Sequence, residues 1–510
     1  MTAQTKIFNT DKRIKLGIWG LGRGANFVKS AAFLNIDVVA GCDIHPEIRE
    51  RFQQIAPKAR CTADEKEFLS WDMDAVLVAT YLPDHAEHTI RVLESGRHVM
   101  CEVTAFQTPA DAVRLVEAVE KSGKVYNLLE NYPFTKENMY LQKLWSEGFF
   151  GEFQYGEFEY LHEYRALSYG YNTYPKVLPI EPGYAVHRWR SILNYHYYCT
   201  HSLGPAMYIT GLRPEAVSAV RDEVTLAGYV EGARQPTAAP SMIRMSNGGL
   251  LRNLMGSTTG DYHSSLRIWG TRASAEKIHD LRIRVGGAGG GMYLLVDAKW
   301  NELGELAKET GHGGGDFWEL YFFAREILTG EPAPWNIYAA CDVTMAGLMA
   351  VRSEKLNGQL VKIPDMRKAE DRELCRNDHG DLPVFDTSDI FPAGHETELA
   401  GQFNRMMTEL YPHGNGGLIL FNNVMDGIRI YADLRDADSK LQVRNSVGKL
   451  IRELPALAAN IELAQKIQQH YPDSKPGHTI ARVLSEQDLP KILNYKQTIQ
   501  ELEDWQNHLI

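Results

Sequence analysis

The chain has 510 residues, of which 44% are hydrophobic and 23% charged, and its formal net charge at pH 7 is -11. These values are typical of a soluble globular protein, and the length predicts two or three domains. The acidic balance, with no long basic run, argues against nucleic acid or an anionic membrane surface as the main partner.

The six cysteines are scattered along the chain without a C-x-x-C pair, and several lie inside apolar runs. This pattern predicts buried free thiols in a reducing compartment. The first residues lack the apolar core of a signal peptide, and no later run has the length of a membrane span. We therefore expect a cytoplasmic protein with no membrane partner.

The first informative stretch, residues 13–43, begins with a short apolar run at 14–19 that predicts a buried parallel strand. The turn GLGRGA follows, in which Gly20 permits the tight turn and Gly22 lets the backbone approach a pyrophosphate. Ala25 takes the small third position, where the next helix packs close to the strand. The amino end of that helix then faces the phosphates of a dinucleotide.

A second apolar run, residues 38–42, ends in Asp43, about 20 residues past the glycines, where a carboxylate accepts hydrogen bonds from the adenosine ribose. The same carboxylate repels a 2′-phosphate, which predicts NAD rather than NADP. Glycine turns also join strands to helices in sheets that bind nothing. The combined strand, turn, helix and terminal acid favours nucleotide binding.

The alternation of strand and helix continues to about residue 130. It predicts a doubly wound parallel sheet, whose ligands bind outside the carboxyl ends of the strands. Three groups of residues should meet at that edge: Thr80 to His85, Glu102 to Thr104, and Glu130 with Asn131. The expected strands are 75–80, 98–103 and 125–130, and the expected helices are 46–55, 85–95 and 109–122.

The pattern changes near residue 150 and again near residue 365. Strand-period alternation after Phe153, a turn at Asn247-Gly248 and a strand at 265–269 predict a mostly antiparallel sheet. Helices are expected at 316–328 and 335–355, a polar linker from 365, and long helices at 443–467 and 492–505. We predict a Rossmann domain (12–148), an α+β substrate and oligomerisation domain (149–368) and a helical C-terminal extension (385–510).

The densest group of titratable and aromatic side chains spans residues 187–205. On a helix Tyr198 and His201 would share a face, and both can exchange protons in a suitable environment. The alternative is an aromatic helix face that packs between domains. His196 and His201 are five residues apart, which is not the spacing of a metal site on a helix, so no metal is expected. No G-x-S-x-G elbow or paired carboxylates indicate an ordinary hydrolase.

Residues 12–365 resemble the Gfo/Idh/MocA oxidoreductase family in the Rossmann segment, in the run VATYLPDHAEHTIRVLESGRHVMCE and in the change near residue 150. Most family dehydrogenases carry Glu-Lys-Pro where this chain has Glu102-Val103-Thr104, and the lysine assists proton transfer. His201 matches the family histidine, whereas Tyr197 stands where many members have an aspartate. The resemblance therefore does not imply a plain alcohol dehydrogenase.

A branch of that family, the NAD-dependent glycosidases of glycoside hydrolase family 109, is similar in several motifs: LLEN at 128–131, YGE at 155–157, YLH at 160–162, YCTHSLGP at 198–205 and GHGGGDF at 311–317. The resemblance implies oxidation of a sugar at C3 by NAD, proton abstraction at C2, elimination, addition of water and return of the hydride. It implies Tyr198 and His201 as the acid/base pair, with Glu130, Tyr160, His187 and Arg190 near the substrate. The implied cofactor-binding residues are Gly20, Leu21, Gly22, Arg23, Asp43, Thr80, Pro83, His85, Glu102 and Val103.

The expected activity is thus redox-assisted hydrolysis of a glycoside with recycled NAD, by a homo-oligomer whose subunits pair as is common in the family. One alternative is a net sugar or cyclitol dehydrogenase or reductase, in which His201 alone handles the proton. The other is a catalytically silent NAD-binding protein with the helical extension as its interaction surface.

Overall fold

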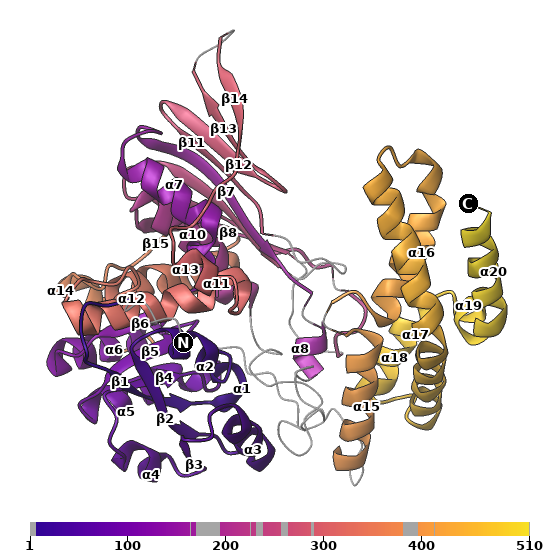
Figure 1. Cartoon of the computed structure of the whole chain (residues 1–510), viewed down its shortest axis with the longest axis horizontal. Helices are drawn as coiled ribbons and strands as arrows, with labels where there is room; N and C mark the ends of the chain where they lie inside the picture. Colours follow the sequence, from indigo (N-terminus) through magenta and orange to yellow (C-terminus); the bar gives the residue numbers. More distant parts are fainter. Residues whose placement is uncertain are drawn as a thin grey trace, which may run out of the picture.

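The computed structural model describes residues 7–163, 165–169, 194–224, 226–230, 238–256, 264–286, 290–380, 396–412 and 414–508. Two β-sheets, with helices around them, and a group of C-terminal helices make up this described part (Figure 1). The predicted fold class is confirmed: a Rossmann-type parallel sheet is followed by a second, mostly antiparallel sheet and then by helices.

The first sheet has six parallel strands in the order β3-β2-β1-β4-β5-β6. Helices cover its faces, so that every residue of β4 is buried. The strands are β1 (Ile14–Trp19), β2 (Ile36–Cys42), β3 (Arg60–Thr62), β4 (Ala75–Val78), β5 (His98–Glu102) and β6 (Tyr126–Leu129). The helices are α1 (Leu21–Gly24), α2 (Phe27–Phe33), α3 (Pro46–Ile55), α4 (Glu65–Ser70), α5 (His85–Glu94) and α6 (Pro109–Ser122).

Local sequence explains where these elements start and stop. In α6 the Thr108 hydroxyl accepts a hydrogen bond from the Asp111 amide, Pro109 occupies the first turn, and Gly123 closes the helix at φ 60°. The predicted strands and helices of this domain are confirmed to within two residues at their ends. The short edge strand β3 and helix α4 were not predicted.

The second sheet has nine strands in the order β14-β13-β12-β11-β7-β10-β9-β8-β15. The predicted antiparallel character holds for all pairs except β7 with β10, which are parallel. The predicted turn at Asn247-Gly248 joins β9 to β10, and Gly248 has φ 87°. The strands are β7 (Phe153–Leu161), β8 (Pro214–Ala219), β9 (Ala238–Met245), β10 (Leu250–Gly256), β11 (Leu266–Gly270), β12 (Ala273–Lys277), β13 (Leu281–Val285), β14 (Met292–Val296) and β15 (Val361–Lys362).

Helices lie between the two sheets and on the second one (Figure 1). Predicted helices 316–328 and 335–355 are confirmed as α12 and α13. The polar linker expected from residue 365 is wrong in part, because residues 369–375 form helix α14. These helices are α7 (Lys136–Ser146), α10 (Thr200–Thr210), α11 (Gly304–Ala307), α12 (Gly315–Thr329), α13 (Ile337–Lys355) and α14 (Ala369–Cys375), together with the short 3-10 turns η1 (Leu82–Asp84), η2 (Tyr132–Phe134), η3 (Tyr195–Tyr198) and η4 (His312–Gly314).

The C-terminal helices bury an apolar core of their own, which also takes in Tyr169, Ala227 and Val230 from the middle of the chain. The long helices expected at 443–467 and 492–505 fall within α17 and within α19 with α20. We call these helices, residues 396–508, the helical extension. They are α15 (Glu396–Leu410), α16 (Gly417–Arg429), α17 (Ala437–His470), α18 (Lys475–Ser485), α19 (Leu489–Leu493) and α20 (Tyr495–Asn507).

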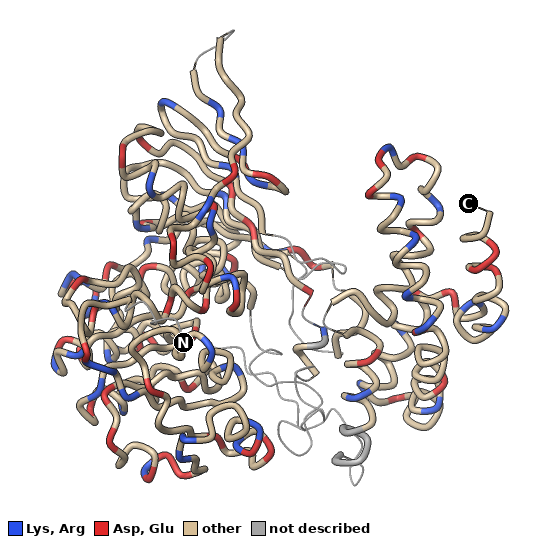
Figure 2. The backbone as a smooth tube through the Cα atoms, in the orientation of Figure 1, with Lys and Arg blue, Asp and Glu red and all other residues tan. Residues whose placement is uncertain are grey.

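The distribution of charged residues and the burial of most cysteines agree with what the sequence predicts. Figure 2 shows basic and acidic residues interspersed along the described chain. The cysteines are free and five of them are buried, whereas Cys61 is partly exposed. Burial raises the pKa of the Cys42 and Cys199 thiols to about 12.

Among the described helices, none combines the length and apolar character needed to cross a membrane. The domain boundaries, the cytoplasmic location and the homo-oligomer stay predictions.

Candidate active site

The glycine turn lies at the carboxyl end of β1, against the end of β4. Gly20 has φ 90°, and a Cβ built on it would stand 2.2 Å from the carbonyl oxygen of Ala79. Only glycine fits, because the conformation is left-handed and the space is taken by backbone. The turn leads directly into α1, so its amides face the edge of the sheet where the sequence predicts the pyrophosphate.

Replacing Gly20 by alanine is expected to weaken NAD binding by about tenfold or more, since each 1.4 kcal/mol of distortion costs a factor of ten. The Cβ must displace the backbone of residues 79 and 80, which form the opposite wall of the turn. NADH fluorescence titration measures the affinity. Gly96→Ala is the control: Gly96 has φ 83° but nothing within 4 Å of the added Cβ. Equal losses of affinity in the two variants would contradict this prediction.

Asp43 is held beside the turn by two backbone amides. Its Oδ2 accepts a hydrogen bond from the Leu21 amide at 2.9 Å, and its Oδ1 accepts one from the His45 amide at 2.9 Å. The carboxylate at the end of β2 is therefore fixed next to the glycine turn. This is the arrangement that recognition of the adenosine ribose requires.

Arg23 points away from the turn toward helix α12. Its guanidinium donates two hydrogen bonds of 2.8 Å to Asp316 and pairs with Glu102 at 2.8 Å. Burial alone would raise the pKa of Asp316. The positive charge and hydrogen bonds of Arg23, together with a hydrogen bond from His312, outweigh this effect and bring the pKa well below its usual range. The side chain of Arg23 thus joins the Rossmann domain to α12.

Glu319, one turn along α12 from Asp316, is 4% exposed, and neither carboxyl oxygen has a hydrogen-bond partner within the described residues. Burial raises the pKa of Glu319 well above 4.5, and the charges of Asp316 and Glu102 raise it further, against the opposing charge of Arg23. The folded chain therefore holds the proton of Glu319 to a higher pH than the unfolded chain does. Glu319 was not among the predicted site residues.

Glu319→Gln is expected to gain stability relative to the wild type as the pH rises. The folded chain keeps the Glu319 proton at a pH at which the unfolded chain has lost it. The stability that Glu319 contributes is therefore fully present below the ordinary pKa of 4.5 and is lost as the pH rises toward the folded pKa. Between the unfolded and the folded pKa of Glu319, the difference in free energy of unfolding between Glu319→Gln and the wild type should grow by about 1.4 kcal/mol per pH unit. Urea unfolding at pH 5, 6, 7 and 8 measures it. Glu305→Gln, at an exposed carboxylate, should show no such trend, and a flat difference for Glu319→Gln would contradict the assignment.

His85 connects the loops that follow β4 and β5. Its Nδ1 and Nε2 donate to the carbonyl oxygens of Thr104 and Thr80 at 2.8 and 3.1 Å. Burial lowers the pKa of His85, but the neighbouring Cys101 and the two carbonyls raise it overall to about 9. Both ring nitrogens are engaged, so any contribution of His85 to cofactor binding passes through these loops, of which one carries Val103. Pro83 lies in the short turn η1 between Thr80 and His85.

The centre of the site is a hydrogen-bonded pair of His201 and Glu130. Nδ1 of His201, in the first turn of α10, donates to the two carboxylate oxygens at 2.8 and 3.0 Å. Glu130 follows β6, is fully buried and also accepts a hydrogen bond from the Tyr132 amide at 3.2 Å. The pair fixes the orientation of the ring and leaves Nε2 as the nitrogen that could exchange a proton.

Three tyrosines surround the His201 ring. The ring centroids of Tyr132, Tyr160 and Tyr198 lie 4.7, 4.8 and 4.8 Å from that of His201. Tyr198 is the last residue of η3 and His201 lies in the first turn of α10, so the two do not share one continuous α-helix, but their rings meet edge to face as the shared face suggested. Tyr132 was not predicted; its signal was its place directly after Glu130 and Asn131.

Two predicted substrate-binding residues, His187 and Arg190, lie outside the described residues. His196 faces away from the pair: its Nε2 donates to the Val220 carbonyl oxygen at 3.2 Å, and burial lowers its pKa to about 4. Within the part of the chain that the structure describes, no group of three histidine, cysteine or acidic side chains could hold a metal ion.

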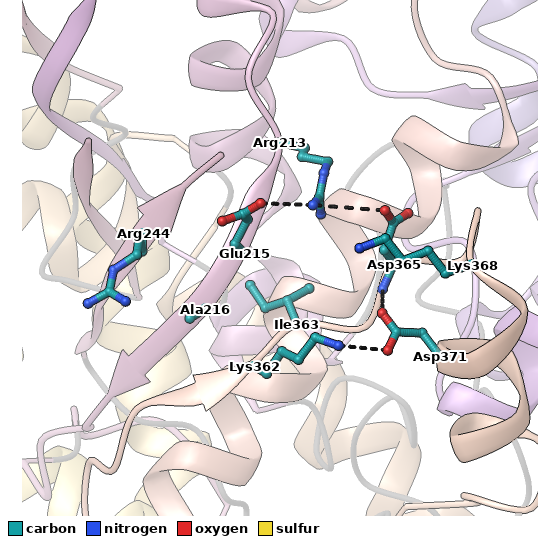
Figure 3. Close-up of a pocket in the computed structure, with 9 residues that line it drawn as sticks. All are labelled: Arg213, Glu215, Ala216, Arg244, Lys362, Ile363, Asp365, Lys368 and Asp371. Atoms are coloured by element: carbon teal, nitrogen blue, oxygen red, sulfur yellow. Dashed lines mark hydrogen bonds and ion pairs between the residues drawn. The ribbon is translucent and has the colours of Figure 1, made fainter. Parts of the chain in front are cut away.

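A separate cavity of about 240 Å³ opens beside β8, β9 and β15 (Figure 3). Arg213 in its wall pairs with Glu215 at 2.8 Å, and Lys362 pairs with Asp371 at 2.7 Å. None of the predicted site residues lines it. The cavity and the His201–Glu130 pair are therefore separate features of the structure.

Comparison with known proteins agrees with this geometry. Residues 14–129 match the model of the Gfo/Idh/MocA oxidoreductase family, described as having an NAD-binding Rossmann fold. A glycosyl hydrolase family 109 protein of Shewanella pealeana is 25% identical over 402 residues, 70% of this chain and 86% of that protein. An alpha-N-acetylgalactosaminidase of Shewanella oneidensis is 25% identical over 403 residues, 70% of this chain and 85% of that protein.

Among solved structures, levoglucosan dehydrogenase in complex with NADH and L-sorbose aligns with a TM-score of 0.58 and 19% identity, over 70% of this chain and 100% of that chain. An oxidoreductase domain protein from Kribbella flavida aligns with a TM-score of 0.56 and 18% identity, over 69% of this chain and 100% of that chain. The family match confirms the predicted NAD-binding Rossmann domain and NAD as the cofactor, and the predicted resemblance to family 109 is confirmed as well.

Proposed function

We propose that this chain, whose residues 14–129 form an NAD-binding domain of the Gfo/Idh/MocA type, is a redox-assisted glycosidase that recycles its cofactor. The observation that carries the proposal is the Glu130–His201 pair with Tyr198 against the imidazole ring. This group stands where α10 meets the carboxyl ends of the Rossmann strands. The names of the family 109 relatives support a glycoside as the substrate.

The residues of the dinucleotide site fit NAD. The turn at Gly20 has no room for a Cβ, and the Asp43 carboxylate is fixed beside it. When bound, NAD supplies a reversible hydride acceptor, and conversion of a sugar hydroxyl to a ketone makes the neighbouring C–H acidic. The residues that would bind NAD are the turn 20–23, Asp43 and the loops after β4 and β5.

The protein's own part is then proton transfer. Glu130 holds Nδ1 of His201, so Nε2 takes or returns the proton of the sugar hydroxyl or of the acidified C–H. Tyr198 supplies a second hydroxyl at the same ring, suited to the other proton of the elimination and addition steps. Tyr160 and Tyr132 exclude water from the pair and offer flat faces to a sugar ring.

Incubation with aryl glycosides, including p-nitrophenyl α-N-acetylgalactosaminide, tests the proposal. We expect release of the aryl alcohol without net NADH, and deuterium at C2 of the product formed in deuterated water. Stoichiometric NADH from a free sugar without cleavage would overturn it. Release of the aryl alcohol without C2 exchange would also count against it, because a direct displacement needs no acidified C–H.

A net sugar dehydrogenase is the second candidate, because the Glu130–His201 pair alone is sufficient for one proton transfer alongside a hydride step. Val103 stands where most family dehydrogenases have the lysine that assists proton transfer. Its absence favours the glycosidase, since a dehydrogenase would have to transfer the proton without that lysine. The dehydrogenase predicts turnover that depends on added NAD.

A further inference from the structure

The segment that leaves β7 is fixed at both ends: by the active site at Tyr160 and by the helical extension at Arg165. We propose that the helical extension sets the position of the β7 end through Arg165, which is a positioning residue for the substrate side of the site. This inference rests on the proposed function for its kinetic readout and on the contacts of Arg165 for its structural one. Figure 1 shows helix α8 (Arg165–Tyr169) between the end of β7 and α15.

Arg165 is a buried hub with partners on three segments. Its guanidinium donates to both carboxylate oxygens of Glu163 at 2.8 and 2.6 Å and to the Ala227 carbonyl oxygen at 2.9 Å. It also lies 3.9 Å from the ring centroid of Tyr411, which follows α15. Arg165 is 6% exposed, so breaking these contacts leaves a buried charge without its partners.

A second contact fixes the other end of α8. The Tyr169 hydroxyl donates to the Gly228 carbonyl oxygen at 2.7 Å, and the Tyr169 ring packs edge to face on Phe403 of α15 at 5.5 Å. Gly228 has φ 95°, and a Cβ there would stand 2.6 Å from the Tyr411 ring and 2.9 Å from Arg165. The close fit around Gly228 indicates a specific docking of α8 onto the extension.

The path from Arg165 back to the site is short. Tyr160 and His162 alternate onto the buried face of the sheet, and the His162 amide donates to the Gly256 carbonyl oxygen at 3.0 Å. Nδ1 of His162 donates to the carbonyl oxygen of Glu163 at 2.7 Å. Glu163 therefore connects the histidine beside Tyr160 to Arg165, and a shift of α8 would move the tyrosine that packs on His201.

The apolar core of the extension is built mainly from its own helices. Its core holds the apolar faces of α15 to α20, and the segment from the middle of the chain contributes Tyr169, Ala227 and Val230. Helices that served only to enlarge the protein would not need to contact a buried arginine, Arg165, that has three kinds of partner. The arrangement is explained if the extension fixes the geometry of the substrate wall.

Tyr411→Leu in the full chain tests the inference. We expect faster amide hydrogen exchange in residues 160–169 and a kcat/KM for aryl glycosides lower by roughly 10- to 100-fold, with unchanged NAD affinity. Tyr411→Phe keeps the ring under Arg165 but loses the hydroxyl that hydrogen-bonds to the guanidinium, so its effects should lie between those of the wild type and Tyr411→Leu. Tyr431→Leu is the matched control, because Tyr431 packs on Trp505 at 5.0 Å inside the extension and should leave residues 160–169 unchanged.

The inference is overturned if Tyr411→Leu leaves exchange at residues 160–169 unchanged, or if Tyr431→Leu produces the same change. Should Tyr411→Leu not fold, Arg165→Lys replaces it, since it keeps the buried charge but loses the two-pronged contact with Glu163. If the wild type cleaves no glycoside, the proposed function fails while the exchange experiment still decides the anchoring.

Discussion

Replacing His201 by asparagine is expected to lower kcat by about 10²- to 10⁴-fold, the usual contribution of a general acid or base. Nε2 of His201 is the atom freed for proton transfer by the Nδ1 contact to Glu130. NAD binding should be unchanged, because the glycine turn and Asp43 lie on other elements. Steady-state kinetics with aryl glycosides and NADH titration measure the two properties separately.

Two tyrosine variants test whether the effect is chemical. Tyr198→Phe, which loses a hydroxyl beside His201, should reduce kcat, whereas Tyr197→Phe should not. Both tyrosines pack on Leu82, but it is the ring of Tyr198 that lies edge to face with His201. Glu130→Gln should fall between the wild type and His201→Asn, since an amide still holds the ring but with no charge. Full activity of His201→Asn would remove the pair from the mechanism.

Arg23→Met is expected to reduce the free energy of unfolding by about 3–5 kcal/mol, the cost of leaving a buried charge without its partner. The substitution leaves the buried Asp316 with His312 alone and removes the cation that faces Glu102. Denaturant unfolding followed by circular dichroism measures the loss. Because Arg23 joins α1 to α12, the loss should appear in the unfolding transition that includes both helices.

Arg13→Met is the matched control for Arg23. Arg13 pairs with Asp37 at 2.7 Å, but both side chains are about half exposed. Its removal should cost less than about 1 kcal/mol. Adding Asp316→Asn to Arg23→Met should recover part of the loss, because the uncompensated carboxylate is gone. Similar losses for Arg13→Met and Arg23→Met would show that the buried contact is not formed.

Most of the Rossmann domain could be predicted because its signals are local. Ile14 to Trp19 is apolar except for Lys15, Gly20 has a left-handed conformation that favours glycine, and Thr108 and Gly123 mark the ends of a helix. Strand β3 was missed because it is a three-residue strand at the edge of the sheet. Its residues are little buried and show no apolar pattern. The parallel pairing of β7 with β10 was missed because strand order is set by tertiary contacts.

The catalytic pair could be predicted only in part. Resemblance placed Glu130, Tyr160, Tyr198 and His201 in one site, and the structure brings their side chains together. The Arg23–Asp316 contact joins residues 293 positions apart, and no local pattern encodes such a contact. Helix periodicity likewise gives no sign that a carboxyl on α12 is buried.

The helical extension shows the same limit. Apolar periodicity predicted long helices near the end of the chain, and α17 and α20 are found there. Periodicity says which face of a helix is buried but not against what. The docking of α8 on the extension depends on Arg165, Tyr411 and Gly228, which are separated in sequence and meet only in the folded chain.

The buried thiols make the protein convenient for fluorescent labelling. Burial raises the pKa of Cys42 and Cys199 to about 12 and that of Cys375 to about 11, and the reactive species is the thiolate. A maleimide dye at neutral pH should therefore modify a cysteine introduced at Leu441, which is 53% exposed on α17, well before these native thiols. Energy transfer from bound NADH to that dye would then report the distance between cofactor and extension during turnover.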